Sequence, residues 1–352
     1  MSFVPPRCPH RDCEQHQNPS DKFFRHHGWY QARCRPEPIP RFRCRYCGRT
    51  FSRQTFRLDY RDRKPETNAP LFDLLTGGVG LRQAGRIVQL DIHSVQGKLR
   101  KFGRHCALLH DNLSPALPAE RAFLLDEEET YETASIRPLT MPVLIERESW
   151  FVVATAVGSI RRAAPAGTAR RRRQELDEQK HGRREDQSSR CVTAAMAALQ
   201  RRQPTGGLKL LTDQKASYAT IASQVFGQRV QHLTTSSKRV RNTHNPLFPI
   251  NTTLAMTRDN CGRLRRRSWL VSKKAERLQA HLHVFTVYRN YVRQRFNSDQ
   301  RRQTPAWFLK LLPRELRPEN VTGWRQDWGT LSIHPLSTCG SRAYCDPPTS
   351  SD

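Results

Sequence analysis

The apolar positions between residues 70 and 113 recur with the period of α-helices. Leu71, Leu74 and Leu75 form a first apolar stripe, which the pair Gly77-Gly78 interrupts. A second helical stripe follows, and the short stretch QLDIHS forms a tight turn before a third helix. That third helix would turn inward three residues spaced i, i+4 and i+7: Val95, Leu99 and Phe102. The pattern predicts a helix-turn-helix over 70–113.

After this helical region the chain alternates between apolar and polar positions, as β-strands do. Three consecutive strands joined by short polar turns are expected as an antiparallel meander: 122–125, 141–145 and 150–157. The first strand would end on Asp126. After a helix near 191–200, an apolar strand at 208–211 leads to Asp213, and another helix follows. The succession predicts an α/β (α+β) core with a mixed sheet over 120–298.

Two stretches of the chain are poor in apolar residues. Residues 161–190 contain ten Lys/Arg and five Asp/Glu, which predicts an exposed, mobile loop. The tail after residue 330 is rich in Ser and Pro and is expected to be poorly ordered. The chain therefore divides into four parts: a Cys-rich segment 1–60, the helix-turn-helix domain 70–113, the core 120–298 with the basic insert 161–190, and a C-terminal extension 299–352.

The charge of the chain narrows the class of partner. The 352 residues include 60 Lys+Arg and 32 Asp+Glu, a formal net charge of +28, which favours double-stranded DNA. An acidic membrane surface is the alternative, but no basic amphipathic helix stands out, and no apolar run approaches the ~20 residues that span a bilayer. The stretch MSFVPPRCPH lacks the apolar region of a signal peptide. We therefore expect a cytoplasmic protein with reduced cysteines.

Four cysteines near the N-terminus are spaced like metal ligands. Cys8 and Cys13 lie in CPHRDC, and Cys44 and Cys47 lie in FRCRYCGRTFS. Gly48 permits the sharp turn that brings the second pair of thiolates onto one ion. A four-thiolate zinc site would supply folding energy to a segment with few apolar residues. The wider spacing of the first pair leaves other ligands open: His10, His16 and Cys34. The alternative is two unrelated pairs of free cysteines.

Basic residues flank both N-terminal segments. Arg43 and Arg45, beside the second cysteine pair, suit a phosphate-binding surface, although simple solubility would also explain them. The third helix begins near His93, and the face expected opposite its apolar stripe offers Ser94, Lys98 and Lys101. A recognition helix presents its N-terminal residues to base edges and its basic residues to phosphates, which predicts DNA contacts here. The alternative is an ordinary three-helix packing unit.

Two carboxylates follow apolar strands of the expected core, Asp126 after the first strand and Asp213 after the strand at 208–211. Mg²⁺ or Mn²⁺ takes oxygen ligands, and two ions ~3.5–4 Å apart stabilise the attacking and leaving oxygens of phosphoryl transfer. Acidic residues after a strand are also common turn formers. The pair in this strand order, downstream of two DNA-binding segments, favours metal-dependent chemistry on nucleic acid.

The motifs in their order resemble a known family. RCRYCGRTFS resembles RCxxCxxxFS, DEEETY resembles DExW/Y, LLTDQKASY resembles xTDGxxxY, and RLRRRSWLVSKKAERLQAHL resembles RLxRKTxxFSKSxxxL. Over residues 8 to about 295 the chain is similar to bacterial insertion-sequence transposases with an N-terminal zinc ribbon, a helix-turn-helix and a ribonuclease-H-like DDE core. The resemblance implies that Asp126 and Asp213 are the first two catalytic acids. The stretch HLTTSSKR resembles a His-to-Lys/Arg segment and offers further DNA-binding candidates: His232, Lys238 and Arg239.

The chain departs from this family at the third acid. The Glu of the family's xxIER falls on Asn251, and the nearest acid is Asp259. Eight residues of helix rise ~12 Å, so Asp259 cannot simply replace a side chain at 251. Three explanations stand side by side: the branch uses Asn251, it uses Asp259 in a shifted geometry, or this copy is inactive. Beside Asp126, Glu127 or Glu128 would support the metal ligand, and two acids would be solvated turn residues: Glu129 and Glu132.

Three functions are compatible with these patterns. The first is a DNA transposase that binds terminal inverted repeats and target DNA, cleaves strands with Mg²⁺ or Mn²⁺, and joins the freed 3′-hydroxyl to the target. It would act as a homo-oligomer on DNA, associated with the bacterial nucleoid. The second is a DNA-binding regulator with an inactive core, and the third is a stand-alone nuclease.

Overall fold

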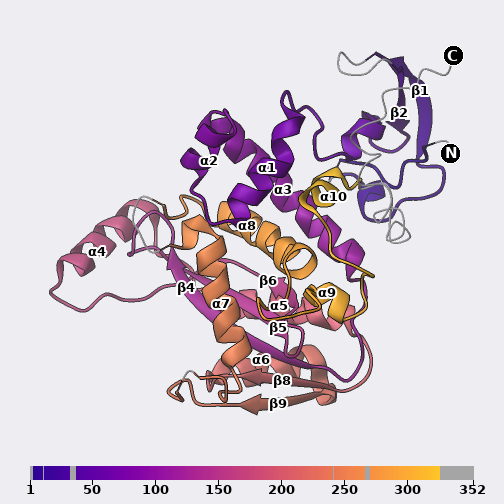
Figure 1. The fold of residues 1–352 in the computed structure, drawn as a ribbon. Helices are drawn as coiled ribbons and strands as arrows, with labels where there is room; N and C mark the ends of the chain where they lie inside the picture. Colours follow the sequence, from indigo (N-terminus) through magenta and orange to yellow (C-terminus); the bar gives the residue numbers. More distant parts are fainter. Residues whose placement is uncertain (1–2, 11, 32–36, 241, 266–269, 326–352) are drawn as a thin grey trace. The chain divides into compact units, whose positions relative to one another are not determined.

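The structure is a computed structural model, and it describes residues 3–10, 12–31, 37–240, 242–265 and 270–325. Contacts divide the chain into two units. Figure 1 shows the chain coloured along its sequence. The first unit comprises Met1–Ala69 with Pro318–Asp352, and the second comprises Pro70–Arg317. Within the described ranges, no helix is both long and apolar enough to cross a lipid bilayer.

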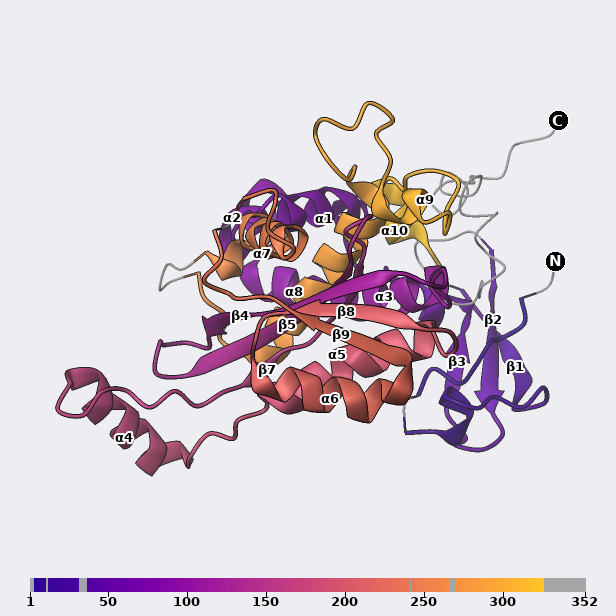
Figure 2. The ribbon, with the colours of Figure 1, turned by 90° about the horizontal axis from the view of Figure 1, so that it is seen from below.

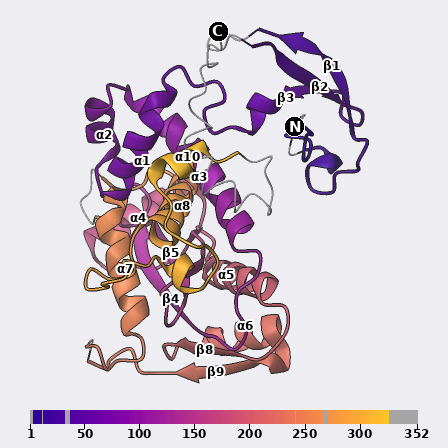
Figure 3. The ribbon, with the colours of Figure 1, turned by 45° about the vertical axis from the view of Figure 1, so that its right-hand side comes forward.

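The first unit contains a small antiparallel sheet with a core of cysteine and phenylalanine side chains. Its strands pair in chain order (Figure 3): β1 Phe24–Tyr30, β2 Ile39–Cys44 and β3 Thr50–Ser52. Short helices accompany the sheet: η1 Glu14–His16, η2 Arg53–Phe56, η3 Pro65–Thr67 and α10 Pro318–Gly323. The main cluster of buried side chains in this unit is small: Cys8, Cys13, Cys44, Phe23, Phe42, Phe51 and Phe56. Such a small apolar core leaves room for a further source of folding energy.

Three helices follow where the helical period predicts them: α1 Asn68–Thr76, α2 Leu81–Ile87 and α3 Ile92–Leu113. Asp91 caps α3, because its carboxylate accepts hydrogen bonds from the backbone N–H groups of His93 and Ser94. α3 packs along α8 (Ala275–Val287), and Gly103 lies so close to Ala280 that a side chain at position 103 would not fit. The helical segment and the sheet therefore share one compact unit.

A close backbone approach holds the turn between α1 and α2. Gly78 has φ +74°, and an ideal Cβ there would lie 2.3 Å from the carbonyl oxygen of Asp259, near the end of α7 (Phe248–Asn260). An ideal Cβ at Gly262 would lie 2.6 Å from the carbonyl oxygen of Gly78. Only glycine fits these two positions, and at position 78 the positive φ adds a second requirement. The turn is thereby locked onto the end of α7.

A mixed six-stranded sheet forms the centre of the second unit. Its strands lie in the order β6-β5-β4-β8-β9, and β7 pairs with β5. The meander of β4, β5 and β6 is antiparallel, whereas β8 runs parallel to β4 and β9 runs parallel to β8. The strands are β4 Ala122–Tyr131, β5 Pro138–Glu146, β6 Val152–Thr155, β7 Gly158–Ser159, β8 Leu208–Thr212 and β9 Val230–Thr234.

Helices cover both faces of this sheet (Figure 2). α5 (Ser188–Arg202) and α6 (Ala216–Phe226) lie on one face, and α7 and α8 lie on the other. The core under α7 and α8 is fully apolar at its centre: Leu124, Met141, Val143, Ile145, Ile250, Leu278 and Leu282. After α8 the chain continues through a π-helical turn, Tyr288–Val292, before the short α9, Pro305–Phe308. The prediction of a mixed α/β fold is confirmed at this level.

The prediction that the first core strand ends at Asp126 is wrong. β4 continues to Tyr131, because β5 pairs with it from Phe123 opposite Glu146 to Tyr131 opposite Pro138. A strand of acidic residues can persist here because most of its carboxylates find cations, as described below. Asp126 therefore lies within a rigid, paired strand rather than in a turn.

The prediction of a mobile loop over 161–190 is also wrong for its central part. This segment contains α4 (Ala169–His181), which Figure 1 shows beyond the end of the sheet. Thr168 caps the helix through a hydrogen bond from the N–H of Arg171. Ion pairs from Arg137 to Asp177 and from Arg161 to Glu178 then attach its acidic residues to cations outside the helix. Counting charges alone misses this pairing.

Candidate functional site

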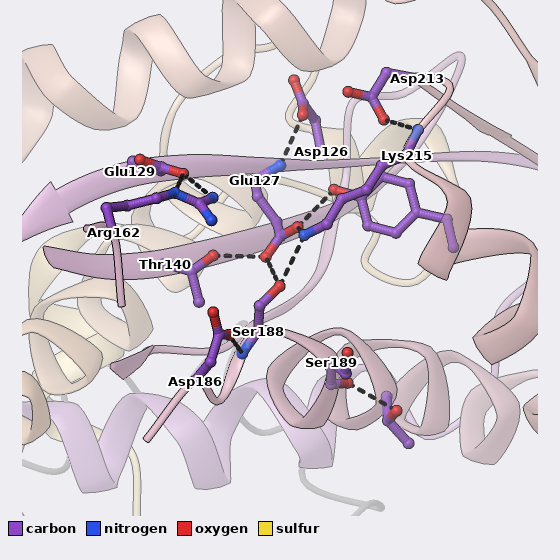
Figure 4. A network of polar contacts seen from close by, with 12 residues as sticks. Asp126, Glu127, Glu129, Thr140, Arg162, Asp186, Ser188, Ser189, Asp213 and Lys215 are labelled. Atoms are coloured by element: carbon purple, nitrogen blue, oxygen red, sulfur yellow. Dashed lines mark hydrogen bonds and ion pairs between the residues drawn. The ribbon is translucent and has the colours of Figure 1, made fainter. Parts of the chain in front are cut away.

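The parallel ladder between β4 and β8 brings two carboxylates together. Leu124 pairs with Leu211, and the same offset continued by two residues places Asp213 beside Asp126. Both leucines belong to the core under α7, so the alternation of side chains turns both aspartates toward the same face. The two side chains are close enough for the negative charge of Asp213 to raise the pKa of Asp126. Figure 4 shows both side chains on one side of the strand.

These two aspartates have no cationic side-chain partner in the described part of the chain. Asp126 accepts the backbone N–H of Glu127 at 2.8 Å, and Asp213 accepts that of Lys215 at 3.0 Å. Burial raises the pKa of Asp126 to about 6, and the negative charge of Asp213 adds to the effect. A chain of net charge +28 thus leaves two adjacent carboxylates uncompensated.

Most other acids of this region are matched with cations. The pairs are Glu127–Lys215, Glu128–Arg258, Glu129–Arg162 and Glu132–Arg184. The prediction that Glu132 is a solvated turn residue is wrong, because its side chain is only 20% exposed and also accepts the N–H of Ala275. Glu129 is exposed, in line with its prediction, but it is ion-paired as well. In the described part of the chain, Asp126 and Asp213 thus stand out as two neighbouring acids without an ion pair.

Glu127 points to the other face of β4 and is saturated with hydrogen bonds (Figure 4). Its Oε1 accepts Thr140 Oγ1 at 2.6 Å and Ser188 Oγ at 2.8 Å. Its Oε2 accepts Tyr218 Oη at 2.8 Å and pairs with Lys215 Nζ. Burial alone would raise the pKa of Glu127, but these four donors lower it below its usual value. Glu127 therefore remains charged and ties together β4, β5, α5 and α6.

Lys215 connects the two faces of the site. Its backbone N–H donates to Asp213, while its ammonium group binds Glu127 and donates to Ser188 at 2.8 Å. Sequence reasoning missed Lys215 and the three other side chains that bind Glu127: Thr140, Ser188 and Tyr218. The one available signal is the spacing of Lys215 and Tyr218, which lie three residues apart at the start of α6 and so share a face.

The two candidates for a third catalytic acid both lie on α7. Asn251 is half-buried and shares a helix face with Arg258, because seven residues make nearly two turns. Arg258 reaches the buried Glu128 of β4, so this face of α7 is turned toward the strand. Asp259 is exposed, and its backbone lies against the turn between α1 and α2.

Among the described residues, no third carboxylate joins the aspartate pair at metal-binding distance. Among the residues that the structure describes, one group of three or more possible ligand atoms lies within 4.8 Å, and it consists of the four cysteines. Neither Asp259 nor Glu128 therefore forms such a group with Asp126 and Asp213. The carboxylate site is a pair.

The three DNA-binding residues predicted from β9 onward differ in their exposure. The ring of His232 bonds to Thr212 Oγ1 at 2.9 Å, and that hydroxyl donates to the carbonyl of Asp213 at 2.7 Å. Burial lowers the pKa of His232. His232 is thus built into the turn that carries Asp213, whereas Lys238 and Arg239 are exposed in the loop after β9.

The four N-terminal cysteines form a second candidate site, in the first unit. Cys8 and Cys47 have their Sγ atoms 3.7 Å apart, and Cys13 and Cys44 have theirs 3.8 Å apart. All four sulfur atoms lie within 4.8 Å of one another. Zinc–sulfur bonds of ~2.3 Å in a tetrahedron place the sulfurs about 3.8 Å apart, so the geometry suits a metal such as zinc.

The alternative ligands for this site are not needed. His16 Nδ1 bonds instead to the carbonyl oxygen of Cys8 at 2.7 Å, which supports the ligand loop. His10 lies in the same loop but outside the four-cysteine group, and Cys34 lies outside the described residues. Arg43 and Arg45 flank Cys44 and are exposed, each with its Nε donating to a backbone carbonyl.

The predicted recognition helix is only partly available at its surface. His93 and Ser94 are exposed at the start of α3, as predicted, and Lys101 is half-buried. The expectation that Lys98 lies on the exposed face is wrong, because the residue is 7% exposed. Lys98 follows Val95 by three positions and precedes Phe102 by four, so helical periodicity places it on the buried side.

No family model matches the chain, and no curated protein matches it.

Proposed function

We propose that the chain is a DNA transposase of the insertion-sequence type. It would bind the terminal inverted repeats of its element, cleave strands with Mg²⁺ or Mn²⁺ at Asp126 and Asp213, and join the freed ends to target DNA as a homo-oligomer. The observation that carries the proposal is the adjacent carboxylate pair without a cationic partner in the described part of a strongly basic chain. The motif resemblance supplies the type of reaction.

The donor set suits a hard divalent cation. Mg²⁺ takes oxygen ligands and keeps several waters, so one or two carboxylates are the usual protein anchors. When bound, the ion would stabilise negative charge on the phosphodiester and make a bound water more acidic. The chain's own residues orient the carboxylates: the N–H of Lys215 fixes Asp213, and the N–H of Glu127 fixes Asp126.

The order of the strands supports the ribonuclease-H-like assignment. An antiparallel meander precedes two strands parallel to β4, which lies at the centre of the sheet. One aspartate lies on β4 and the other directly follows β8. This arrangement agrees with the core that the resemblance implies.

Three further features support DNA as the partner. The four-cysteine cluster suits a zinc ribbon, with Arg43 and Arg45 exposed beside it. The exposed start of α3, at His93 and Ser94, suits the recognition helix of a helix-turn-helix. Lys238 and Arg239 add exposed cations on the loop after β9.

A catalytically inactive DNA-binding regulator is the second candidate, and one observation favours it. The family's third acid is replaced by Asn251, and the same face of α7 carries Arg258, which already neutralises Glu128. A two-carboxylate site holds fewer charges for metal ions than a three-carboxylate site does. Under this alternative, DNA binding would persist without metal-dependent cleavage.

The deciding experiment uses the DNA that flanks the coding region as substrate. Labelled element ends are incubated with protein and Mg²⁺, and cleaved and strand-joined products are separated. We expect Asp213→Ala to reduce both products at least ~100-fold, the scale on which metal sites respond to lost partners. Glu148→Gln is the matched control, since this acid is 64% exposed on the turn after β5.

The possible outcomes separate the candidates. Products that Asp213→Ala leaves unchanged contradict the transposase and the nuclease alike. Cleavage without joined product assigns the chain as a nuclease. Binding of the ends with no product from the wild-type protein assigns it as a regulator.

A further inference from the structure

A large basic cavity lies away from the carboxylate pair. It has a volume of about 1340 Å³, and its described lining residues come from the turn between α1 and α2, the start of α3, and α8 with the described residues before it, among them Arg263, Arg265 and Lys273. Five of its lining residues are cationic and none is acidic: Arg82, Arg263, Arg265, Lys273 and Arg277. Neither Asp126 nor Asp213 lines it. The cavity is therefore separate from the site already described.

The cations of this cavity are not neutralised by the described part of the chain. None of the five forms an ion pair with a described carboxylate. Arg263 is only 7% exposed, and burial lowers its pKa to about 10, with the nearby charge of Arg277 adding to the effect. The Nε of Arg277 is buried and has no hydrogen-bond partner among the described atoms. Arg263 is thus a buried cation, Arg277 is partly buried, and neither has a counter-charge among the described carboxylates, which indicates a place for an anion.

The hydrogen bonds around Arg263 hold its guanidinium group in place but bring no negative charge to it. The Nε of Arg263 donates to Nδ1 of His281, and Nε2 of His281 contacts the carbonyl oxygen of Leu75. Because a guanidinium only donates, Nδ1 must accept, and His281 stays neutral. Burial accordingly lowers the pKa of His281 to about 3. The network orients the guanidinium at the cavity wall without supplying a negative charge.

The size of the cavity, and its continuation into a second one, favour a polymer over a small molecule. Its volume exceeds the ~300–1,000 Å³ that small-molecule pockets occupy. A second cavity of about 390 Å³ shares Arg82 and Ile92 with it and adds Arg86, so the basic surface continues along α2. Guanidinium groups match phosphate oxygens with paired hydrogen bonds. A charged groove that extends beyond one pocket suits successive phosphates.

We propose that this cavity binds the sugar-phosphate backbone of DNA beside the start of α3. Ile92 and Gln96 of α3 line the cavity, while His93 and Ser94 of the same turn are exposed and remain available to base edges. The proposal rests on the proposed function in taking DNA as the partner. It is independent of the carboxylate chemistry.

The test measures the affinity for a labelled duplex by fluorescence anisotropy over a range of salt concentrations. The variant Arg82→Gln/Lys273→Gln removes two exposed cations of the cavity, so its fold is not at risk. Losing two phosphate contacts should reduce the slope of log K against log salt by about two and weaken binding about 10- to 100-fold at ~0.1 M salt. The loss should be the same for unrelated duplex sequences, because phosphates carry no base information.

The matched control is Arg201→Gln/Lys209→Gln, which removes two exposed cations from α5 and β8, outside the cavity. It should change the slope by much less than the cavity variant. An equal loss in both variants overturns the cavity as a specific site. Unchanged binding by the cavity variant also overturns it, while wild-type DNA binding and Asp213-dependent cleavage would leave the proposed function standing.

Other polyanions are tested in the same assay, with tripolyphosphate and polyglutamate as competitors. Under the proposal, tripolyphosphate and polyglutamate each compete only weakly with the duplex. Their effect on duplex binding should be the same for the cavity variant as for the wild-type protein. Tight tripolyphosphate binding that the cavity variant loses, with duplex binding unchanged, assigns the cavity to a free polyphosphate and overturns the proposal. The same result with polyglutamate assigns it to an acidic protein and overturns the proposal too.

Discussion

Two neighbouring residues on β4, Asp126 and Glu127, differ in how fully their carboxylates are hydrogen-bonded. Asp126 has one backbone donor and no cation in the described region, while Glu127 accepts four side-chain donors on the other face of the strand. A carboxylate as well satisfied as Glu127 has little capacity left for a ligand. The alternation of the strand thus separates Asp126, which keeps unused acceptor capacity, from Glu127, which holds the scaffold together.

The ion pair of Lys215 with Glu127 should be worth more than a surface pair. Glu127 is 9% exposed in its side chain, so Lys215→Met would leave a buried carboxylate short of its cation. We expect a loss of about 2–4 kcal/mol in the free energy of unfolding. Urea unfolding measures it, and the double variant Lys215→Met/Glu127→Gln should recover part of the loss.

The control for this prediction is Arg162→Met. It breaks the pair with Glu129, in which both side chains are about half exposed. The expected cost is no more than about 1 kcal/mol. Equal losses for Lys215→Met and Arg162→Met would show that Glu127 is not held as the contacts indicate.

At the scale of residues, the sequence predicts where a side chain lies in the fold better than it predicts which side chains bind to it. The adjacency of Asp126 and Asp213 follows from two apolar strands, each leading to an acid, once those strands lie side by side and parallel. The partners of Glu127 do not follow, because Lys215 and Tyr218 lie about ninety positions along the chain. Nothing local to Glu127 indicates which cation will reach it.

At the scale of elements, the turn between α1 and α2 is the most constrained connection. Gly78→Ala would force a Cβ to within 2.3 Å of the backbone oxygen of Asp259 and would also strain a φ of +74°. Gly206 has φ +76° with nothing within 4 Å of its ideal Cβ, so Gly206→Ala carries the strain without the clash. The two glycines therefore form a matched pair.

We expect Gly206→Ala to destabilise by about 1–2 kcal/mol, the cost of a left-handed conformation for an L-residue. Gly78→Ala should cost at least ~3 kcal/mol, because backbone atoms must also move. Thermal unfolding of both variants measures the difference. Equal effects would mean that the turn is not held against α7.

The elements themselves are predicted well where one period dominates and poorly where charge dominates. The stripe at Val95, Leu99 and Phe102 gives α3 because helical spacing persists through it. The insert 161–190 has no such stripe, and the ion pairs that accompany α4 come from Arg137 and Arg161, outside the helix. Charge composition reports solvation, but it does not report which charges will pair.

At the scale of the whole molecule, the two units differ in what stabilises them. The second unit has a large apolar core on a six-stranded sheet, whereas the first relies on a few phenylalanines and the four-cysteine cluster. The cysteine spacing predicts the four-cysteine cluster correctly. Two closely spaced pairs of cysteines can place four thiolates around one ion, and this requirement does not depend on the rest of the fold. The C-terminal extension predicted at 299–352 is described as far as Arg325, and the rest lies outside the described residues.

Removal of metal should therefore unfold one unit before the other. We expect a strong chelator to release about one Zn²⁺ per chain and to expose the first unit to protease, because structural zinc supplies folding energy directly. The second unit should keep its thermal transition. Colorimetric zinc release, limited proteolysis and calorimetry measure these effects, and Cys44→Ser should reproduce them without chelator. A single shared transition that the chelator leaves unchanged would contradict the prediction.

The lock at Gly78 and Gly262 has a consequence for distance along DNA. It holds the turn between α1 and α2 against the end of α7, within the compact unit that also contains the sheet and the carboxylates. Under the proposed function, the protein would then work as a ruler: a duplex held at α3 meets Asp126 and Asp213 at a set number of base pairs from the sequence it recognises. Lengthening the turn at Gly78 would blur that count.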